Sequence, residues 1–241
     1  MHLRDRVPEI RRLLETALDC DEEYLYEGEM SYYARTYAGD AVSQLRMMFA
    51  SSAPTPEEIN ACVAEFADAE RMANGKSQMV LLNLSDKSRP ILDALSRSNE
   101  ARLRLLALEA GGQWTNYLYY SPLYPSVDMK IRLLEDPDEE VRLAAVLAAG
   151  ETMRHNMKSL GWMIEKNREH WFVELYKTFF ELLDDPSPRI RAAAAEALSQ
   201  WAAANSRAAL IERLEKESAP AVRKILTAII ESPPDVESLQ K

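Results

Sequence analysis

The chain has 241 residues, of which 47% are apolar and 28% charged, and it contains only 7 glycines. This composition is that of an ordinary globular protein and excludes disordered, fibrous and low-complexity classes. The 29 basic and 39 acidic residues give a net charge of −10. The charge argues against a nucleic-acid partner, because phosphate binding needs clustered Lys and Arg. A basic protein remains a suitable partner.

The cysteines and the N-terminus indicate the compartment. Cys20 and Cys62 lie far apart and neither belongs to a CxxC pair, which predicts two free thiols in a reducing environment. Residues 1–8 are charged and lack the apolar stretch of a signal peptide. No apolar run approaches the ~20 residues that span a bilayer. We therefore expect a soluble, cytoplasmic protein without a membrane partner.

The spacing of apolar residues predicts helices along the N-terminal part, with no alternating pattern typical of strands. The third predicted helix has the clearest start, because Thr55 and Glu58 form a capping-box pattern with Pro56 at the first helical position. Gly111 and Gly112 are expected to end the last of these helices. The predicted helices are 7–18, 39–50, one starting at 56 and ending before Gly75, 77–84, 89–97 and 101–110.

The C-terminal half contains an internal repeat. Residues 136–145 read DPDEEVRLAA, and residues 185–194 read DPSPRIRAAA. A looser copy covers 218–225 and a fainter one 98–105. The arginines that anchor these copies are Arg104, Arg142, Arg191 and Arg223. Recurrence of one helix-start pattern predicts stacked helix pairs, because one pair cannot bury its apolar face alone.

Within each strong copy the pattern suggests a role for every position. An apolar helix end precedes Asp136 and Asp185, and each Asp is expected to cap the next helix, with the following proline at the first helical position. Val141 and Ile190 are expected to face the core one turn later. The alanines behind them allow helices to approach closely.

The D-P-x-x-x-[VI]-R-x-A-A pattern of 136–145 and 185–194 resembles HEAT repeats, and looks most like the short bacterial type first named from bilin lyases. The strong resemblance covers residues 128–231, and the fainter copy extends it to 91. It implies an all-α, armadillo-type α-solenoid of antiparallel helix pairs that often holds a partner protein. It also implies structural roles for the repeat residues Asp136, Pro137, Arg142, Asp185, Pro186, Arg191 and Arg223.

The domain organisation expected from these patterns is a single solenoid over residues 1–241. Residues 1–90 would add helices without the motif, residues 91–231 would form the repeats, and residues 232–241 would be a frayed tail. The long spacing between Arg142 and Arg191 indicates an insertion near 151–168. Insertions in solenoids often cluster on one face.

No catalytic motif accompanies the repeats. The sequence lacks HExxH, His-Glu pairs, GxSxG and phosphate-binding loops, and its three histidines are His2, His155 and His170. We therefore expect no metal and no cofactor. Enzymes are known on HEAT scaffolds, so a bilin lyase-like or alkylpurine DNA glycosylase-like activity remains the alternative. Trp162, Trp171 and Trp201 lie at apolar helical positions that favour core packing over base stacking.

Two segments rich in tyrosine are the candidate partner-binding surface. The first is also strongly acidic between residues 19 and 29, and the second follows Trp114. Tyrosine suits interfaces, and adjacent acids complement a basic partner. The alternative is a solvated acidic turn with tyrosines packed beneath it. The candidate residues are Asp21, Glu22, Glu23, Tyr24, Tyr26, Glu27, Tyr32, Tyr33, Tyr117, Tyr119 and Tyr120.

The sequence thus predicts a non-enzymatic protein-interaction module. An adaptor, an assembly factor and an inhibitor or immunity-type protein that neutralises a basic partner all fit this class. An enzyme on a HEAT scaffold remains the alternative.

Overall fold

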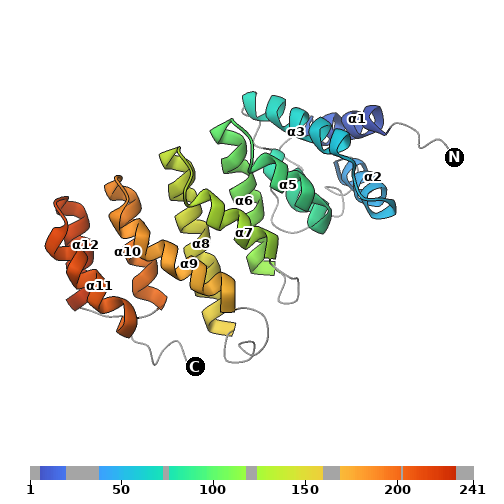
Figure 1. Ribbon diagram of the computed structural model, residues 1–241. Helices are drawn as coiled ribbons and strands as arrows, with labels where there is room; N and C mark the ends of the chain where they lie inside the picture. Colours follow the sequence, from blue (N-terminus) through green and yellow to red (C-terminus); the bar gives the residue numbers. More distant parts are fainter. Residues whose placement is uncertain are drawn as a thin grey trace. The chain divides into compact units, whose positions relative to one another are not determined.

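The structure is a computed structural model, and it describes residues 6–19, 38–72, 76–117, 124–159, 169–201 and 203–231. Within these ranges the regular elements are all helices and no strand is present (Figure 1). The all-α class predicted from the sequence is confirmed. None of the described helices combines the length and the apolar character needed to cross a membrane.

The chain divides into two compact units, Met1–Trp114 and Thr115–Lys241. The division falls within helix α6 (Ala101–Tyr117), which carries the faintest copy of the motif, and not near residue 90. A single continuous domain over residues 1–241 stays a prediction.

The first unit is built around helix α1. The apolar residues of α1 recur at helical spacing, so Ile10, Leu13 and Leu14 form one buried face. This face packs against α2 and α3, and α3 in turn contacts α5. The helices are α1 (Val7–Leu18), α2 (Ala38–Ser51), α3 (Pro56–Arg71), α4 (Ser77–Leu84), α5 (Arg89–Leu95) and α6, with a short 3-10 turn η2 (Ser85–Ser88) before α5.

An arginine fastens three helices of this unit together. Arg6 donates through Nε and Nη2 to the two carboxylate oxygens of Glu58, at 2.6 and 2.7 Å. Its Nη1 donates to the carbonyl of Met48 at 3.0 Å and to Oγ of Ser52 at 2.8 Å. Glu58 also closes the predicted capping box with Thr55, which is confirmed. The guanidinium therefore joins the start of α1 to the end of α2 and the start of α3.

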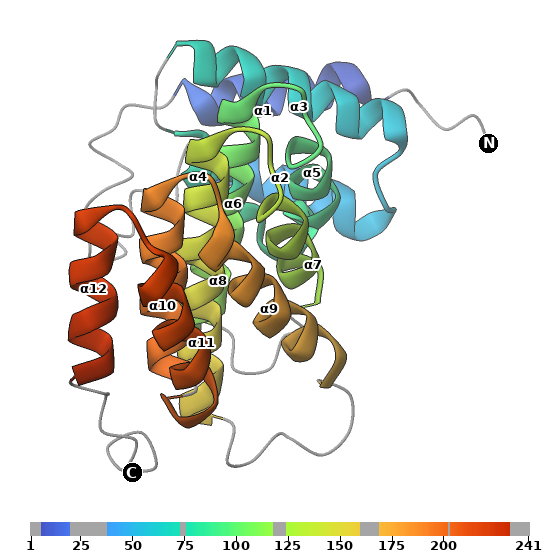
Figure 2. The same cartoon turned by 60° about the vertical axis from the view of Figure 1, so that its left-hand side comes forward.

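The second unit consists of helix pairs in two layers. Helix α8 packs against α10 and α10 against α12, while α7 lies beside α9 in the other layer with α11 (Figure 2). The helices are α7 (Tyr124–Leu133), α8 (Glu139–Ser159), α9 (Glu169–Glu181), α10 (Pro188–Trp201), α11 (Ala203–Lys216) and α12 (Pro220–Glu231), with the 3-10 turn η4 (Leu182–Asp184) after α9. Val141 and Ile190 are fully buried as predicted.

One predicted helix end is wrong. Gly111 and Gly112 do not stop the helix that starts at Ala101, which continues to Tyr117. A glycine inside a helix costs about 1 kcal/mol relative to alanine, but it ends a helix only when the chain also adopts a C-terminal capping turn. The glycine pair therefore weakens the helix without terminating it.

Candidate functional site

The four motif arginines make the same hydrogen bond. Each donates from Nη1 to the backbone carbonyl of the residue six positions earlier, and this bond ties the start of the helix to the turn before it. The pairs are Arg104 with Ser98 at 2.8 Å, Arg142 with Asp136 at 2.7 Å, Arg191 with Asp185 at 2.8 Å, and Arg223 with Glu217 at 2.9 Å. The fainter copies of the motif thus share the backbone geometry of the strong ones.

The side chain six positions before each arginine also makes the same hydrogen bond in all four copies. It accepts a hydrogen bond from the backbone N–H two residues further on, which closes a tight polar turn. The acceptors are Ser98 at 3.1 Å, Asp136 at 2.9 Å, Asp185 at 2.7 Å and Glu217 at 2.8 Å. We call each such turn, with its arginine, a corner.

The corners correct the predicted helix caps. Asp136 and Asp185 do not cap the following helices, because those helices start three residues later. Asp138 caps α8 by accepting from the backbone N–H groups of Glu140 and Val141. Ser187 caps α10 by accepting from Arg189.

The prolines of the motif were misplaced for the same reason. Pro137 and Pro186 lie inside the turns, and Pro188 is the first residue of α10. Asp followed by Pro is typical both of a capped helix start and of a turn, and the sequence alone did not separate the two.

Successive corners of the second unit are joined by arginine–carboxylate pairs. Arg142 donates to the carboxylate of Asp185 from Nε at 3.1 Å and from Nη2 at 3.4 Å. Arg191 donates to Glu217 from Nε and Nη2, both at 2.8 Å. Each arginine thus holds its own turn with Nη1 and binds the acid of the next corner with its other two nitrogens. We call this arrangement the corner ladder.

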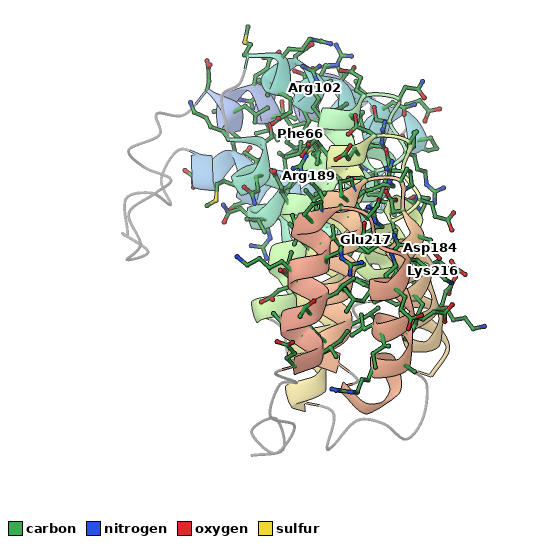
Figure 3. All side chains as sticks on the ribbon, turned by 90° about the vertical axis from the view of Figure 1, so that its left-hand side faces the viewer. Phe66, Arg102, Asp184, Arg189, Lys216 and Glu217 are labelled. Carbon is green, nitrogen blue, oxygen red and sulfur yellow. The ribbon has the colours of Figure 1, made fainter. Side chains whose placement is uncertain are left out.

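Glu217 is the most strongly held acid of the ladder. Its side chain is fully buried, and Arg213 donates to it in addition to Arg191. Hydrogen bonds from Arg191 lower the pKa of Glu217 far below its usual value, against the effect of burial. Arg213 also pairs with Asp184 at 2.7 Å, so this arginine connects two corners. Figure 3 shows Asp184, Lys216 and Glu217 gathered at one edge of the unit.

Glu217 was missed in the sequence, where the looser copy was aligned from Ser218. A simple signal identifies it. Counting six residues back from Arg142 or Arg191 gives an Asp, and counting six back from Arg223 gives Glu217.

A cavity of about 410 Å³ lies between the first two corners of the second unit. It is the candidate binding site. Five of the eleven residues around it are acidic, and Arg142 is the single basic one. The lining residues are Leu134, Glu135, Asp136, Pro137, Arg142, Thr178, Glu181, Leu182, Asp184, Asp185 and Pro186.

Two of the lining carboxylates are available to a ligand. Asp185 is bound to Arg142 and Asp184 to Arg213. Glu135 and Glu181 are exposed, and neither forms an ion pair with any residue that the structure describes. A cavity that offers unpaired carboxylates beside satisfied ones attracts a cation. The site is suited to a Lys or Arg side chain.

The predicted partner-binding segments lie outside the part of the chain that the structure describes. Residues 21–33 and Tyr119 and Tyr120 fall in the gaps, and Tyr117 is described only as a backbone position in α6. These residues stay a prediction. The same holds for the side chains of His155, Trp171 and Trp201, while Trp162 lies in the gap after α8.

Among the described residues, metal-ligating side chains and the free cysteine Cys62 do not form a reactive site. No group of three or more potential metal ligands occurs among the described residues. Cys62 is free and buried, and burial raises the pKa of its thiol to about 12. A thiol with such a pKa is protonated at neutral pH and is a weak nucleophile.

Comparison with known proteins agrees with the repeated corners. Residues 158–230 match a family model described as HEAT repeats, and this range contains the corners at Asp185 and Glu217. No curated protein matches the chain significantly. The match and the described helix pairs confirm the predicted all-α, HEAT-like solenoid fold class. Residues 158–230 of this chain are similar to HEAT repeats.

Proposed function

We propose that this protein is a non-enzymatic interaction module that binds a basic segment of another protein. The observation that carries the proposal is the HEAT-repeat array, a scaffold that commonly mediates protein interactions through its extended surfaces. The sign of the partner's charge follows from the net charge of −10 and from the acidic lining of the cavity. Adaptor, assembly factor and inhibitor of a basic protein all belong to this proposal.

Two surfaces are candidates for the contact. The cavity presents Glu135 and Glu181 beside two ion-paired corners, so an incoming Lys or Arg would meet unpaired carboxylates on a rigid frame. The second surface is the acidic, tyrosine-rich set predicted from the sequence, which includes Asp21, Glu22 and Tyr24. Charge complementarity at either surface speeds association and makes binding sensitive to salt.

The first experiment is affinity capture of the full chain from a lysate of its source, at low and at moderate salt, read by mass spectrometry. We expect one stoichiometric basic protein that is lost as the salt concentration rises. A co-purifying small molecule, or no partner at either salt concentration, would contradict the proposal and favour an enzyme on the HEAT scaffold.

Charge-reversal variants then locate the surface. Glu135→Lys with Glu181→Lys should weaken capture of that partner about tenfold or more, because two attractive contacts become repulsive. Glu215→Lys is the matched control, since Glu215 is exposed on α11 and lies outside the cavity. Neutralising Asp21, Glu22, Glu23 and Glu27 tests the other surface. If every variant binds as the wild type does, neither surface makes the contact.

A further inference from the structure

Within the second unit, the contact between the second and third corners contains an arginine that bridges them. Arg213 lies four residues before Glu217, the acid of the third corner, and donates to it from Nη2 at 2.9 Å. From Nη1 it donates at 2.7 Å to Asp184, which lies one residue before the acid of the second corner. One guanidinium thus joins two carboxylates from neighbouring corners, and its side chain is only 15% exposed.

The contact between the first and second corners holds two acids at the equivalent positions. Glu181 lies four residues before the acid of its corner, as Arg213 does. Glu135 lies one residue before the acid of its corner, as Asp184 does. The cation and the anion of one contact are thus replaced by two carboxylates in the contact before it.

The acid of the second corner accepts the same hydrogen bonds as Glu217, apart from those of Arg213. Asp185 accepts two bonds from Arg142 and one from the backbone N–H of Ser187. Glu217 accepts the corresponding three and binds Arg213 in addition. A carboxylate has about four lone-pair sites, so Asp185 can accept one more donor.

The cavity lies where these acceptors meet. Glu135, Glu181 and Asp185 all line it, and its volume is about 410 Å³. No Lys or Arg in the described ranges forms an ion pair with Glu135 or Glu181. The cavity therefore offers a guanidinium the same kind of carboxylate set that Arg213 binds one contact further along.

We propose that the cavity binds an arginine side chain of the partner protein, whose guanidinium bridges Glu135 and Asp185 in the manner of Arg213. Glu181 places a negative charge where the next contact has a positive one, so the site attracts the partner's cation. This inference rests on the proposed function, because it names the side chain that the basic partner places in the cavity.

The occupant is an arginine rather than a lysine because the acceptors come from two corners. A guanidinium carries its N–H donors in a rigid, planar fork and can bridge two carboxylates, whereas an ammonium is a compact point charge. The walls also contain apolar groups on which the aliphatic stem of an arginine packs. These groups are Leu134, Pro137, Leu182 and Pro186.

NMR titration of the full chain at low salt tests the occupant with two capped tripeptides, one with Arg and one with Lys between glycines. We expect the arginine peptide to bind about tenfold tighter, because only the guanidinium bridges two carboxylates. Glu135→Gln with Glu181→Gln should weaken its binding about tenfold. Glu174→Gln with Glu215→Gln is the matched control, since it removes two exposed acids outside the cavity and should leave the affinity unchanged.

A second variant supplies the guanidinium from the chain itself. Glu181→Arg places an arginine at the position equivalent to Arg213, so it should raise the urea midpoint of unfolding and abolish binding of the arginine peptide. Glu174→Arg makes the same change on α9 outside the cavity and should do neither. Unchanged peptide binding in Glu181→Arg would show that the two contacts are not equivalent and would overturn the inference.

The inference and the proposed function fail on different results. Equal affinity for the two peptides would exclude the arginine bridge. Binding of neither peptide, or binding that the cavity variant leaves unchanged, would exclude the site. The proposed function survives these results if the full chain still captures a basic partner from its lysate. A chain that binds the arginine peptide but captures no basic partner would contradict the proposed function and not the arginine site.

Discussion

Lys130 and Glu217 are both buried charged residues, yet their surroundings act on them in different ways. Glu217 receives hydrogen bonds from two arginines and from the backbone of Ala219, so its charged form is favoured despite burial. Lys130 is 1% exposed, and burial lowers the pKa of its ammonium group to about 8. The charge of Glu217 thus stabilises the fold, whereas the charge of Lys130 costs stability.

The lysine gives a testable pH dependence. Between pH 8 and 10 the unfolded chain still holds the proton of Lys130, whose ordinary pKa is 10.5, while the folded chain has released it. Stability rises with pH wherever the unfolded state binds more protons. The free energy of unfolding in urea should therefore rise from pH 7.5 to 9.5, and Lys130→Met should reduce that rise.

Lys177→Met is the control for this titration, because Lys177 is an exposed lysine on α9. It should leave the pH dependence unchanged. An identical rise in wild type and Lys130→Met would show that another group is responsible.

At the scale of elements, the starts of α8 and α10 use two separate devices. The residue just before each helix caps its first turn, and the acid two residues earlier closes the corner; before α10 this acid also accepts from the preceding arginine. Asp138 and Ser187 do the first, and Asp185 does the second for Arg142. Because the helix cap and the corner each need their own hydrogen-bond acceptor, the motif carries polar residues at both positions.

The cap of α8 yields a direct prediction. Asp138→Ala should lower the free energy of unfolding by about 1 kcal/mol, the typical cost of losing an N-cap. Asp138→Asn should retain most of the stability, because asparagine caps helices about as well. Chemical denaturation followed by circular dichroism measures both. Equal losses for Ala and Asn would mean that the negative charge, and not the cap, is what matters.

At the scale of the molecule, each compact unit has its own arginine–carboxylate pair with a buried carboxylate. Arg6 and Glu58 join three helices of Met1–Trp114, and Arg191 and Glu217 join two corners of Thr115–Lys241. Every contact of each pair given above lies within one unit. Loss of a pair should therefore lower the stability of the unit that contains it first.

Hydrogen exchange can localise these losses. Glu217→Gln leaves two arginines facing a neutral amide, and a broken buried ion pair costs about 3 kcal/mol. We expect the most protected amides of α10 and α12 to exchange about 100-fold faster, with α1 and α3 unchanged. Arg6→Gln should show the reverse distribution. Equal acceleration in both units by either variant would contradict this prediction.

Much of the local structure was predictable because its causes lie within a few residues. The capping box at Thr55 involves partners three residues apart, and the buried positions of Val141 and Ile190 follow from helical spacing. The corners were harder, because Asp136 and Pro137 are compatible with a cap and with a turn. The helix through Gly111 was mispredicted because glycine lowers helix propensity without ending a helix.

The sequence by itself determined the all-α class, the positions of the repeat and the sign of the charge, since periodicity, motif spacing and composition are properties of the chain alone. Only the tertiary structure decided which acid each arginine meets. Arg142 binds a residue 43 positions away and Arg191 one 26 positions away. Helix and loop lengths between corners vary, and packing brings successive corners within hydrogen-bonding distance of one another. The acidic cavity exists for the same reason: its walls come from two corners that only packing brings together.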